Sequence, residues 1–302
     1  LSDRSVSDLS ITGVCMIPLR MRWLGTACFE IVLPNGKTLV IDPFVDDSVS
    51  SPITSDQFEA CDYLFLTHGH YDHILDTGKL ASRFNPIIYC SPLVSKSLSI
   101  HLGVSPDQIR AVTTGDIVRA NGMTIKVIQG THVDFLSDYN RLTGKELQPE
   151  MPVKDAIETT LTKTFETDWR PPRIEEWMEK FPQGEQLNYV FEPDQGPRVY
   201  MAGTRSDPNQ IKIAGDVQAD ITLLQVPPAN ALKGLEKSTA DLAIASGCQV
   251  CVPQHHDPLL KGAKKTDLSI LKTLLSGIRF QELAPGKWYV FEGEQLKKYD
   301  AC

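Results

Sequence analysis

The stretch THGHYDH, residues 67–73, constrains the fold of this chain more than any other feature. It holds three of the chain's 7 histidines and an aspartate, and it directly follows the apolar run DYLFL, which predicts a buried β-strand. Residues i and i+2 of an extended segment point the same way, so His68 and His70 can converge on one point. Asp72 and His73 come where the chain turns into a helix, and they can reach a second point close by. The fold must therefore end a buried strand where all four side chains can meet.

The chemistry of these side chains predicts a divalent metal site. Neutral imidazole and carboxylate are good ligands for Zn²⁺, and left unpaired they would crowd polar groups together with little apolar gain. One segment cannot complete two coordination shells, but other predicted strands also end in histidine. The run TIKVIQGTH ends at His132, and CQVCVPQHH ends at His255 and His256. We expect one or two ions, zinc first, with manganese, iron or cobalt as alternatives.

The predicted strands come in two blocks, each of which finishes with helical patterns. The first block runs from Arg20 to His132 and the second from Leu187 onward. Two such blocks predict an α/β (α+β) fold in which two sheets pack together with helices outside, a four-layer αββα sandwich. We expect a single domain over residues 1–302, with a loose N-terminal tail at residues 1–19.

One segment, residues 134–186, interrupts this pattern as an insertion directly after His132. It is polar, weakly helical and carries Trp169 and Trp177. Because a structureless loop of that length is unusual in a compact domain, one interpretation is a small helical lid beside the site. The other is a surface elaboration with no catalytic role.

The composition of the chain limits the kinds of binding partner that we expect. The net charge of -8 and the pI of about 5.4 argue against nucleic acid as a partner, since proteins that grip phosphate backbones carry basic stripes. No apolar run approaches the roughly 18 residues that span a bilayer, so we expect no membrane contact. The 7 cysteines are scattered, which favours reduced thiols in a cytoplasmic protein. A small-molecule substrate fits these features, and the oligomeric state is unknown from sequence.

Four motifs of this chain resemble those of the metallo-β-lactamase superfamily. They are THGHYDH, the GTH that ends at His132, the YMAGT that contains Gly203, and the VPQHH that ends at His256. The run LGTACFEIVLPNGKTLVIDPF is also similar to the first strands of this family. IDPF and VPQH look most similar to its ascorbate-phosphate-lactonase-like branch. The resemblance extends from Arg20 to His256 and implies the metallo-β-lactamase fold.

This resemblance also implies roles for individual residues. One metal ion would be held by His68, His70 and His132, and a second by Asp72, His73 and His255. His256 is the less favoured neighbour. Asp42 and Thr67 would orient the imidazoles from behind, although Asp42 could instead cap the turn before Pro43. Asp72 would also be catalytic, because it could orient the attacking water and collect a proton.

The sequence departs from the family at Thr204. The family usually has an aspartate directly after the glycine of YMAG, and this aspartate bridges the two metal ions. Asp207, three residues on, is the substitute ligand that we consider first, and Asp134 is another. Either the second ion binds weakly, or the site holds one ion, or another oxygen bridges.

Together these features predict a metal-dependent hydrolase, in which a metal-bound hydroxide attacks a small ester or lactone. The ester or lactone is preferred on the resemblance alone, so the lactonase or esterase class stays open. A phosphodiesterase on nucleotides or nucleic acid is the first alternative. Its anionic substrate would need cations, yet the insertion carries seven Lys and Arg against twelve Asp and Glu, and we expect Arg205 to be solvated.

The second alternative is a non-catalytic metal-binding protein that has lost the bridging aspartate. The retained histidines argue against it, because unused ligands have no physical reason to stay together. A redox di-iron site is less favoured still, since that branch of the family usually has a carboxylate where this chain has His70.

Overall fold

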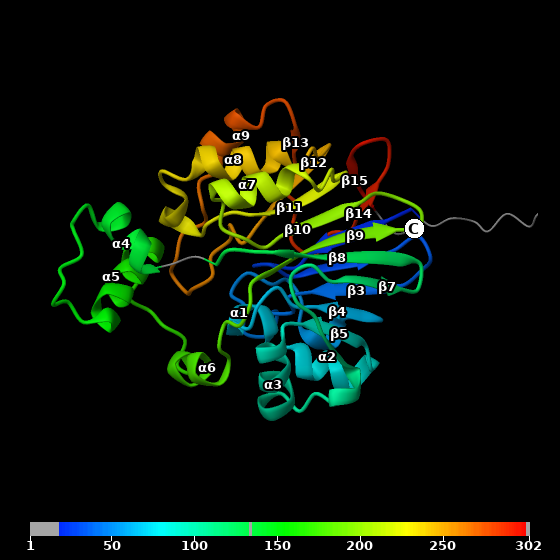
Figure 1. Ribbon diagram of the computed structural model, residues 1–302, viewed down its shortest axis with the longest axis horizontal. Coiled ribbons are helices and arrows are strands. Elements are labelled where there is room, and N and C mark those ends of the chain that lie inside the picture. Colours follow the sequence, from blue (N-terminus) through cyan, green and yellow to red (C-terminus); the bar gives the residue numbers. More distant parts are fainter. Residues whose placement is uncertain (1–17, 133–134, 300–302) are drawn as a thin grey trace, which may run out of the picture.

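The fold is seen in a computed structural model that describes residues 18–132 and 135–299. Most of the predicted tail (residues 1–17) and Asp134 lie outside the described residues. Two β-sheets pack face to face, and helices cover both outer faces (Figure 1). The predicted four-layer αββα sandwich is confirmed.

The first sheet contains eight strands in the order β15-β14-β1-β2-β3-β4-β5-β6. Neighbours from β3 to β6 run parallel, and the other pairs are antiparallel. The strands are β1 Arg20–Trp23, β2 Phe29–Val32, β3 Thr38–Ile41, β4 Tyr63–Phe65, β5 Ile87–Cys90, β6 Ile109–Ala111, β14 Tyr289–Phe291 and β15 Leu296–Lys298.

The second sheet contains seven strands in the order β13-β12-β11-β10-β9-β8-β7. Neighbours from β10 to β13 run parallel, and β7, β8, β9 and β10 pair in antiparallel fashion. The strands are β7 Ile117–Ala120, β8 Met123–Gln129, β9 Leu187–Pro193, β10 Val199–Ala202, β11 Ile221–Gln225, β12 Val250–Gln254 and β13 Arg279–Phe280.

The helices fall into three sets. Those over the first sheet are α1 Tyr71–Ile74, α2 Thr77–Phe84 and α3 Pro92–His101, and those over the second sheet are α7 Pro208–Gly215, α8 Glu236–Ala245 and α9 Ser269–Leu274. The third set lies in the insertion and consists of α4 Phe135–Thr143, α5 Val153–Phe165 and α6 Ile174–Lys180. Short 3-10 turns are η1 Ser55–Gln57, η2 Pro106–Gln108 and η3 Ala229–Leu232.

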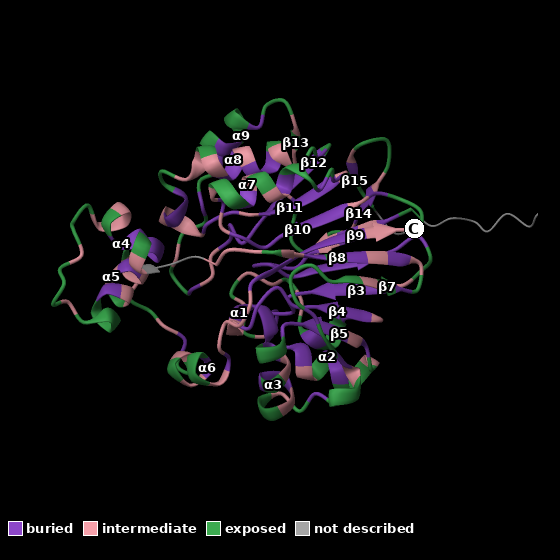
Figure 2. Ribbon diagram, viewed as in Figure 1, coloured by how far each residue is buried: buried purple, intermediate pink, exposed green. Residues whose placement is uncertain are grey.

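The period-2 geometry of strands explains the layers. In β3, Leu39 and Ile41 point into the core between the sheets, whereas Val40 points outward to the core beneath α1, α2 and α3. In β4, Phe65 faces the inner core and Leu64 the outer one. Both faces of these two strands are therefore buried, which is why their sequences are continuous apolar runs. Figure 2 shows that buried residues predominate in the central strands of the sandwich.

The two sequence blocks do not correspond to the two sheets. The hairpin β7–β8 lies in the first block but belongs to the second sheet, and β14 and β15 return from the C-terminal end to the first sheet. Met21 of β1 pairs with Tyr289 of β14, so the returning hairpin covers an edge of β1 that would otherwise be open.

The insertion stands at one end of the sandwich. Figure 1 shows α4 and α5 projecting beyond the sheets, with α6 nearer to α3. The predicted helical character of residues 134–186 is thus present in three helices. Whether the segment acts as a lid stays a prediction.

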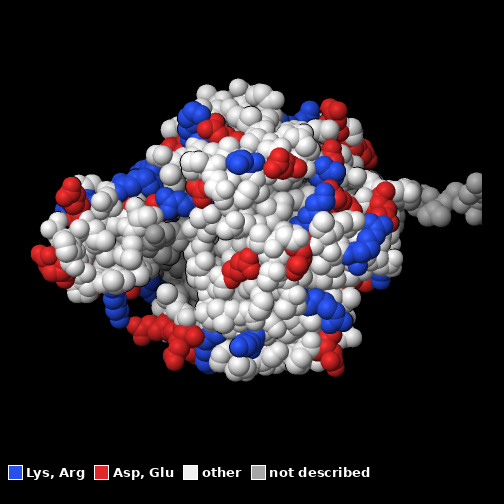
Figure 3. Space-filling view, in the orientation of Figure 1, with Lys and Arg blue, Asp and Glu red and all other residues white. Residues whose placement is uncertain are grey.

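The surface carries mixed charge. Figure 3 shows Lys and Arg interspersed with Asp and Glu on the face it presents, with no continuous basic stripe. Among the described residues, no helix has both the length and the apolar character needed to cross a bilayer.

Candidate metal centre

Histidines from both sheets converge at the carboxyl ends of the central strands. The motif 67–73 follows β4 of the first sheet and leads into α1, with His70 directly before the helix. His132 follows β8 and His255 follows β12, both in the second sheet. Loops at the carboxyl ends of parallel strands are where α/β sheets commonly place their sites. The site therefore lies where the two sheets meet at one edge.

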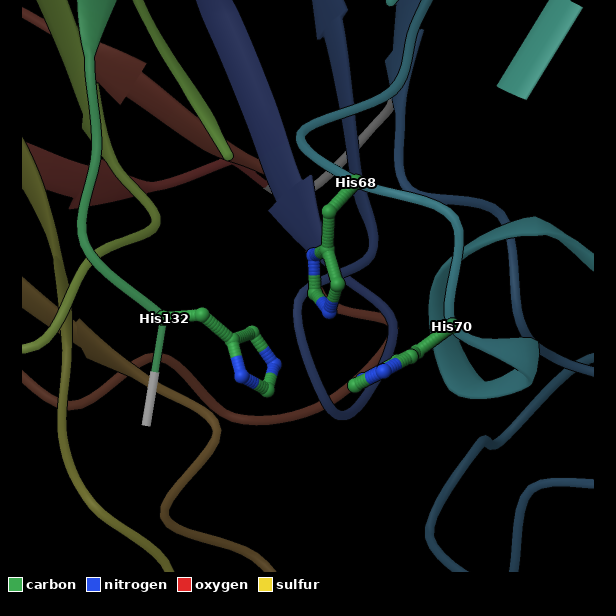
Figure 4. A group of neighbouring side chains, drawn as sticks. All are labelled: His68, His70 and His132. Carbon is green, nitrogen blue, oxygen red and sulfur yellow. The ribbon is translucent and has the colours of Figure 1, made fainter. Parts of the chain in front are cut away.

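The first group consists of His68, His70 and His132. Their potential ligand atoms all lie within 4.8 Å of one another. The ring centroids are 4.7 Å apart for His68 and His70, and 4.5 Å apart for His70 and His132. Figure 4 shows the three rings pointing toward a common space. Three imidazoles form a donor set that holds catalytic zinc with one coordination position left open.

The second group consists of Asp72, His73 and His255, again with ligand atoms within 4.8 Å of one another. The Asp72 Oδ2 lies 3.3 Å from the His255 Nε2 and 3.6 Å from the His73 Nε2. The ring centroids of His68 and His73 are only 4.0 Å apart. The two groups are therefore neighbours, and a cation in one would lie close to a cation in the other.

Asp42 and Thr67 support the groups from behind. The fully buried Asp42 carboxylate accepts a hydrogen bond from the His73 Nδ1 at 2.8 Å and another from the Thr67 hydroxyl at 2.7 Å. The Thr67 hydroxyl also lies 3.1 Å from the His68 Nδ1. A carboxylate behind an imidazole fixes its tautomer and leaves the other ring nitrogen facing the site.

Burial and charge set the protonation states. Burial lowers the pKa of His68 well below its usual value and that of His70 to about 4, so both rings are neutral near pH 7, the form that binds metal. Burial opposes ionisation of Asp72, but His73 and His255 hold its pKa below the usual range. Burial would lower the pKa of His73, yet Asp72 and Asp42 raise it. The two carboxylates therefore make the His73 ring more basic than the rings of His68 and His70.

The donor set fits a divalent ion. Neutral imidazoles and one ionised carboxylate are ordinary ligands of zinc, and all six side chains are more than half buried or fully buried. His255 adopts a φ of 62°, which is unfavourable for a residue with a side chain, and the backbone bond from its N–H to the Thr26 carbonyl, at 2.8 Å, holds it there. Such strain is typical of functional positions.

Thr204 binds the backbone next to His132. Its buried hydroxyl accepts a hydrogen bond from the Thr131 N–H at 2.6 Å and donates to the Thr131 carbonyl at 3.1 Å. The side chain thus fixes the backbone just before His132. Where the family pattern has a carboxylate, this chain has a positioning contact for one of its histidines.

The structure also leaves Asp207, the substitute ligand considered first, outside both groups. Its carboxylate caps the N-terminus of α7, where it accepts a hydrogen bond from the Gln210 N–H at 2.9 Å. An aspartate before a proline at the first helical position is a common start for a helix, and this local bond keeps the side chain away from the histidines.

The sequence predicted a solvated Arg205, and this prediction is wrong. Its guanidinium donates to the Asp138 carboxylate at 2.8 Å, and only 19% of its side chain is exposed. Asp138 lies on α4, is itself buried and also pairs with Arg141 at 3.1 Å. The ion pair ties the loop after β10 to the insertion. Sequence reasoning missed Asp138, because one aspartate in a polar segment carries no distinguishing signal.

Gly69, between His68 and His70, is a second residue that sequence reasoning missed. Its N–H donates to the Gln183 carbonyl at 2.7 Å, and a Cβ at this position would lie 2.2 Å from the Pro182 carbonyl oxygen. The end of the insertion thus presses directly against the histidine motif. A glycine inside the motif was the available signal for this close approach.

His256 lies apart from the two groups. Its ring stacks on Trp23 with 4.8 Å between centroids, and burial lowers its pKa to about 4. The neighbouring His255 points to Asp72 instead. The positive φ of His255 turns the chain between the two histidines, so that they face different surroundings.

A cavity of about 540 Å³ opens beside the two groups. One side is lined by the predicted metal ligands and the other by the insertion, mainly from α5 and α6. Its volume is in the range of small-molecule sites.

Comparisons with known proteins agree with this geometry. A family profile described as "Metallo-beta-lactamase superfamily" matches residues 21–255. A UPF0173 metal-dependent hydrolase of Polaromonas sp. is 24% identical over 277 residues, which cover 88% of this chain and 87% of that protein. A second one, from Koribacter versatilis, is 39% identical over 74 residues, 24% of this chain and 32% of that protein. Another from Roseiflexus sp. is 34% identical over 119 residues, 38% and 48% of the two chains. The matches to the last two thus span only a third to a half of those relatives.

Solved structures share the fold. Igni18, a metallo hydrolase from Ignicoccus hospitalis, superposes with a TM-score of 0.63 at 17% identity, covering 92% of this chain and all of that one (100%). An isothiocyanate hydrolase from Delia radicum gut bacteria superposes with a TM-score of 0.57 at 17% identity, covering 91% and 100% of the two chains. At these identities the likeness is one of fold.

Proposed function

The chain belongs to the metallo-beta-lactamase superfamily, and from that premise we propose that it is a metal-dependent hydrolase of a small, uncharged ester or lactone. The observation that carries the proposal is the pair of adjacent groups, His68, His70, His132 and Asp72, His73, His255, at the wall of one cavity. All six side chains line the cavity. They are therefore accessible to a ligand and are not simply packed in the hydrophobic core.

Each group would hold one divalent ion, zinc first. When bound, such an ion lowers the pKa of water toward about 7 and polarises a carbonyl oxygen. Asp72 is ionised, and from its place between His73 and His255 it can accept a hydrogen bond from a water molecule and orient it. The same carboxylate could then collect a proton from that water.

The first group has three neutral donors and no carboxylate, whereas the second contains Asp72. With Thr204 and Asp207 engaged elsewhere, no further carboxylate joins the two groups among the described residues. The ions would thus share less negative charge than in relatives with a bridging aspartate. We therefore propose that one ion binds more tightly than the other.

The cavity favours an uncharged substrate. Among the described residues that line it, Arg170 is the only Lys or Arg, and it pairs with Glu158 at 3.4 Å and donates to the Thr167 carbonyl at 2.9 Å. Arg205, on the loop after β10, is occupied by Asp138. Apart from the proposed metal ions, a phosphodiester would therefore meet no unpaired Lys or Arg among the described lining residues, which is less favourable for an anion than for an uncharged ester.

The test combines elemental analysis of the purified protein with a hydrolysis panel of lactones, carboxylic esters, thioesters and phosphodiesters. We expect zinc or a related ion, and turnover of a lactone or ester. His70→Ala should abolish turnover, whereas His101→Ala, an exposed histidine on α3, should retain it.

The outcomes separate the alternatives. Turnover of phosphodiesters alone would replace the ester by a phosphodiesterase activity. Bound metal without turnover of any class would favour a binding role. Turnover that survives His70→Ala would place the reaction elsewhere in the molecule.

A further inference from the structure

The wall of the cavity that the insertion supplies is apolar. Ile157, Leu161 and Phe165 line the cavity from α5 at intervals of four residues, so they form a single stripe on one helix face. Ile174 and Met178 of α6, followed by Phe181, continue this surface. We call these six side chains the apolar wall.

The polar and apolar lining residues come from different parts of the chain. The metal-binding groups stand at the strand ends, while the apolar wall stands on the helices of the insertion. The charged side chains from the insertion that line the cavity, Asp138 and Arg170, are both engaged in ion pairs. A ligand in this cavity would thus meet reactive groups at one end and hydrocarbon at the other.

Met178 marks the outer end of the wall. It is 59% exposed although it lines the cavity, whereas Phe165 is 4% exposed. An exposed methionine beside buried aromatic and aliphatic residues offers an adaptable apolar surface at a mouth. The wall also extends a cavity of about 540 Å³, more than a short acyl group fills.

We propose that the apolar wall binds an unbranched, medium-length hydrocarbon chain on the acyl side of the substrate, and that Leu161 and Met178 determine the preferred chain length. The proposal rests on the proposed hydrolase function for the identity of the reacting group, but the binding of the chain can be measured without turnover. Each methylene that the wall removes from water strengthens binding roughly fourfold.

The first experiment measures binding by calorimetry with decanoic acid and propionic acid as probes. Decanoate should bind at least roughly tenfold more tightly than propionate, and with a negative heat-capacity change. Met178→Glu places a charge on the wall and should weaken decanoate binding about tenfold. Val153→Glu is the matched control, because Val153 is also 59% exposed and lies on the insertion but does not line the cavity.

The second experiment measures kcat/KM for the p-nitrophenyl esters of acetate, hexanoate and decanoate. The ratio of decanoate to acetate should exceed one in the wild-type protein, fall about tenfold in Met178→Glu and stay unchanged in Val153→Glu. Leu161→Trp, which fills part of the cavity, should shift the preference from decanoate to hexanoate.

The failures are distinguishable. Decanoate binding that depends on Met178, without hydrolysis of any ester, would support chain binding by the apolar wall and contradict the proposed hydrolase function. The opposite result is ester hydrolysis with equal binding of decanoate and propionate, or with a chain-length ratio that Met178→Glu does not change. Either outcome would contradict chain binding by the apolar wall but would be consistent with the hydrolase function.

Discussion

Asp42 links the backbone of the first sheet to the proposed ligands. It follows β3 with a φ of 45° and accepts hydrogen bonds from both His73 and Thr67. Asp42→Asn keeps the size of the side chain but removes its charge and one acceptor. We expect zinc affinity to fall roughly 10- to 100-fold, the usual effect of losing a carboxylate behind a metal-binding imidazole. Competition with a coloured chelator measures it.

Asp207→Asn is the control for this loss of charge. Asparagine caps a helix about as well as aspartate, so neither the stability of α7 nor the zinc affinity should change. Equal zinc affinities for the Asp42 and Asp207 variants would contradict the supporting role of Asp42.

Gly69 sets the distance between the histidine motif and the end of the insertion. In Gly69→Ala the new methyl would meet the Pro182 carbonyl oxygen, so the backbone between His68 and His70 must move. We expect a loss of about 2 kcal/mol in unfolding free energy together with weaker zinc binding. Gly215→Ala, at the end of α7 with no neighbouring atom within 4 Å of its Cβ, should be neutral or stabilising. Denaturant unfolding of the two variants decides this, and unchanged stability in Gly69→Ala would refute the close contact.

Single residues also show what the sequence could and could not predict about the site. The spacing in residues 67–73 and the strand-terminal histidines identified side chains that the structure brings together. The roles of Thr204 and Arg205 could not be predicted, because each depends on a partner far away in the sequence, Thr131 and Asp138. Local pattern carries no information on such pairs.

At the scale of elements, an aromatic pair helps to hold α6 against the histidine motif. Trp177 stacks on Tyr71 with 5.0 Å between ring centroids and is 6% exposed. Trp177→Ala should remove this anchor, so that the insertion opens locally without global unfolding. Limited proteolysis with mass spectrometry should then show faster cleavage within residues 135–186. Trp169→Ala, at a position 37% exposed, should not change the rate, and equal rates for both variants would argue against the anchor.

A second contact between elements predicts a pH effect on stability. Glu282, after β13, pairs with Lys265 at 2.6 Å and with Lys272 of α9 at 2.5 Å. Burial alone would raise the pKa of Glu282, but the two lysines lower it from 4.5 to about 2. A carboxyl whose pKa is lower in the folded state stabilises the fold above its unfolded pKa. This stability is lost as the pH falls from 4.5 toward 2.

Glu282→Gln should therefore lower the unfolding free energy at pH 7 by about 1 kcal/mol, since solvent screens pairs with half-exposed lysines. The difference from wild type should vanish as the pH approaches about 2. Chemical denaturation across this range measures it. Glu179→Gln, an exposed position on α6, serves as the charge-matched control, and a difference that does not depend on pH would contradict the ion-pair origin.

At the scale of the whole molecule, the pattern of apolar residues predicted the strands and the layers. It did not predict which strand belongs to which sheet. The sequence predicted two sheets with outer helices, and that architecture is confirmed. It did not predict that β14 would return to pair with β1, because the two strands stand at opposite ends of the described chain and pattern does not encode long-range pairing. The same limit applies to the site, whose residues come from both sheets.

Because the proposed ligands come from both sheets, we expect metal removal to lower the thermal stability of the whole molecule. The proposed ligands follow β4 of one sheet and β8 and β12 of the other, so a bound ion would connect the sheets directly. Binding to the folded state alone stabilises it by about 2.7 kcal/mol when the free ion is at 100 times its Kd. Removing the ion with a chelator should therefore lower the Tm by roughly 5–10 °C in a single transition, and added zinc should restore it.

The variant His132→Ala separates this connection from a local effect. It removes the ligand that the second sheet contributes to the first group, while His68 and His70 remain on the first sheet. Zinc should then raise the Tm by less than half as much as in the wild-type protein, whereas His101→Ala should respond fully. If a protein that elemental analysis shows to be loaded with metal keeps its Tm after chelation, the ion does not join the sheets. In that case the histidines stabilise the fold without it.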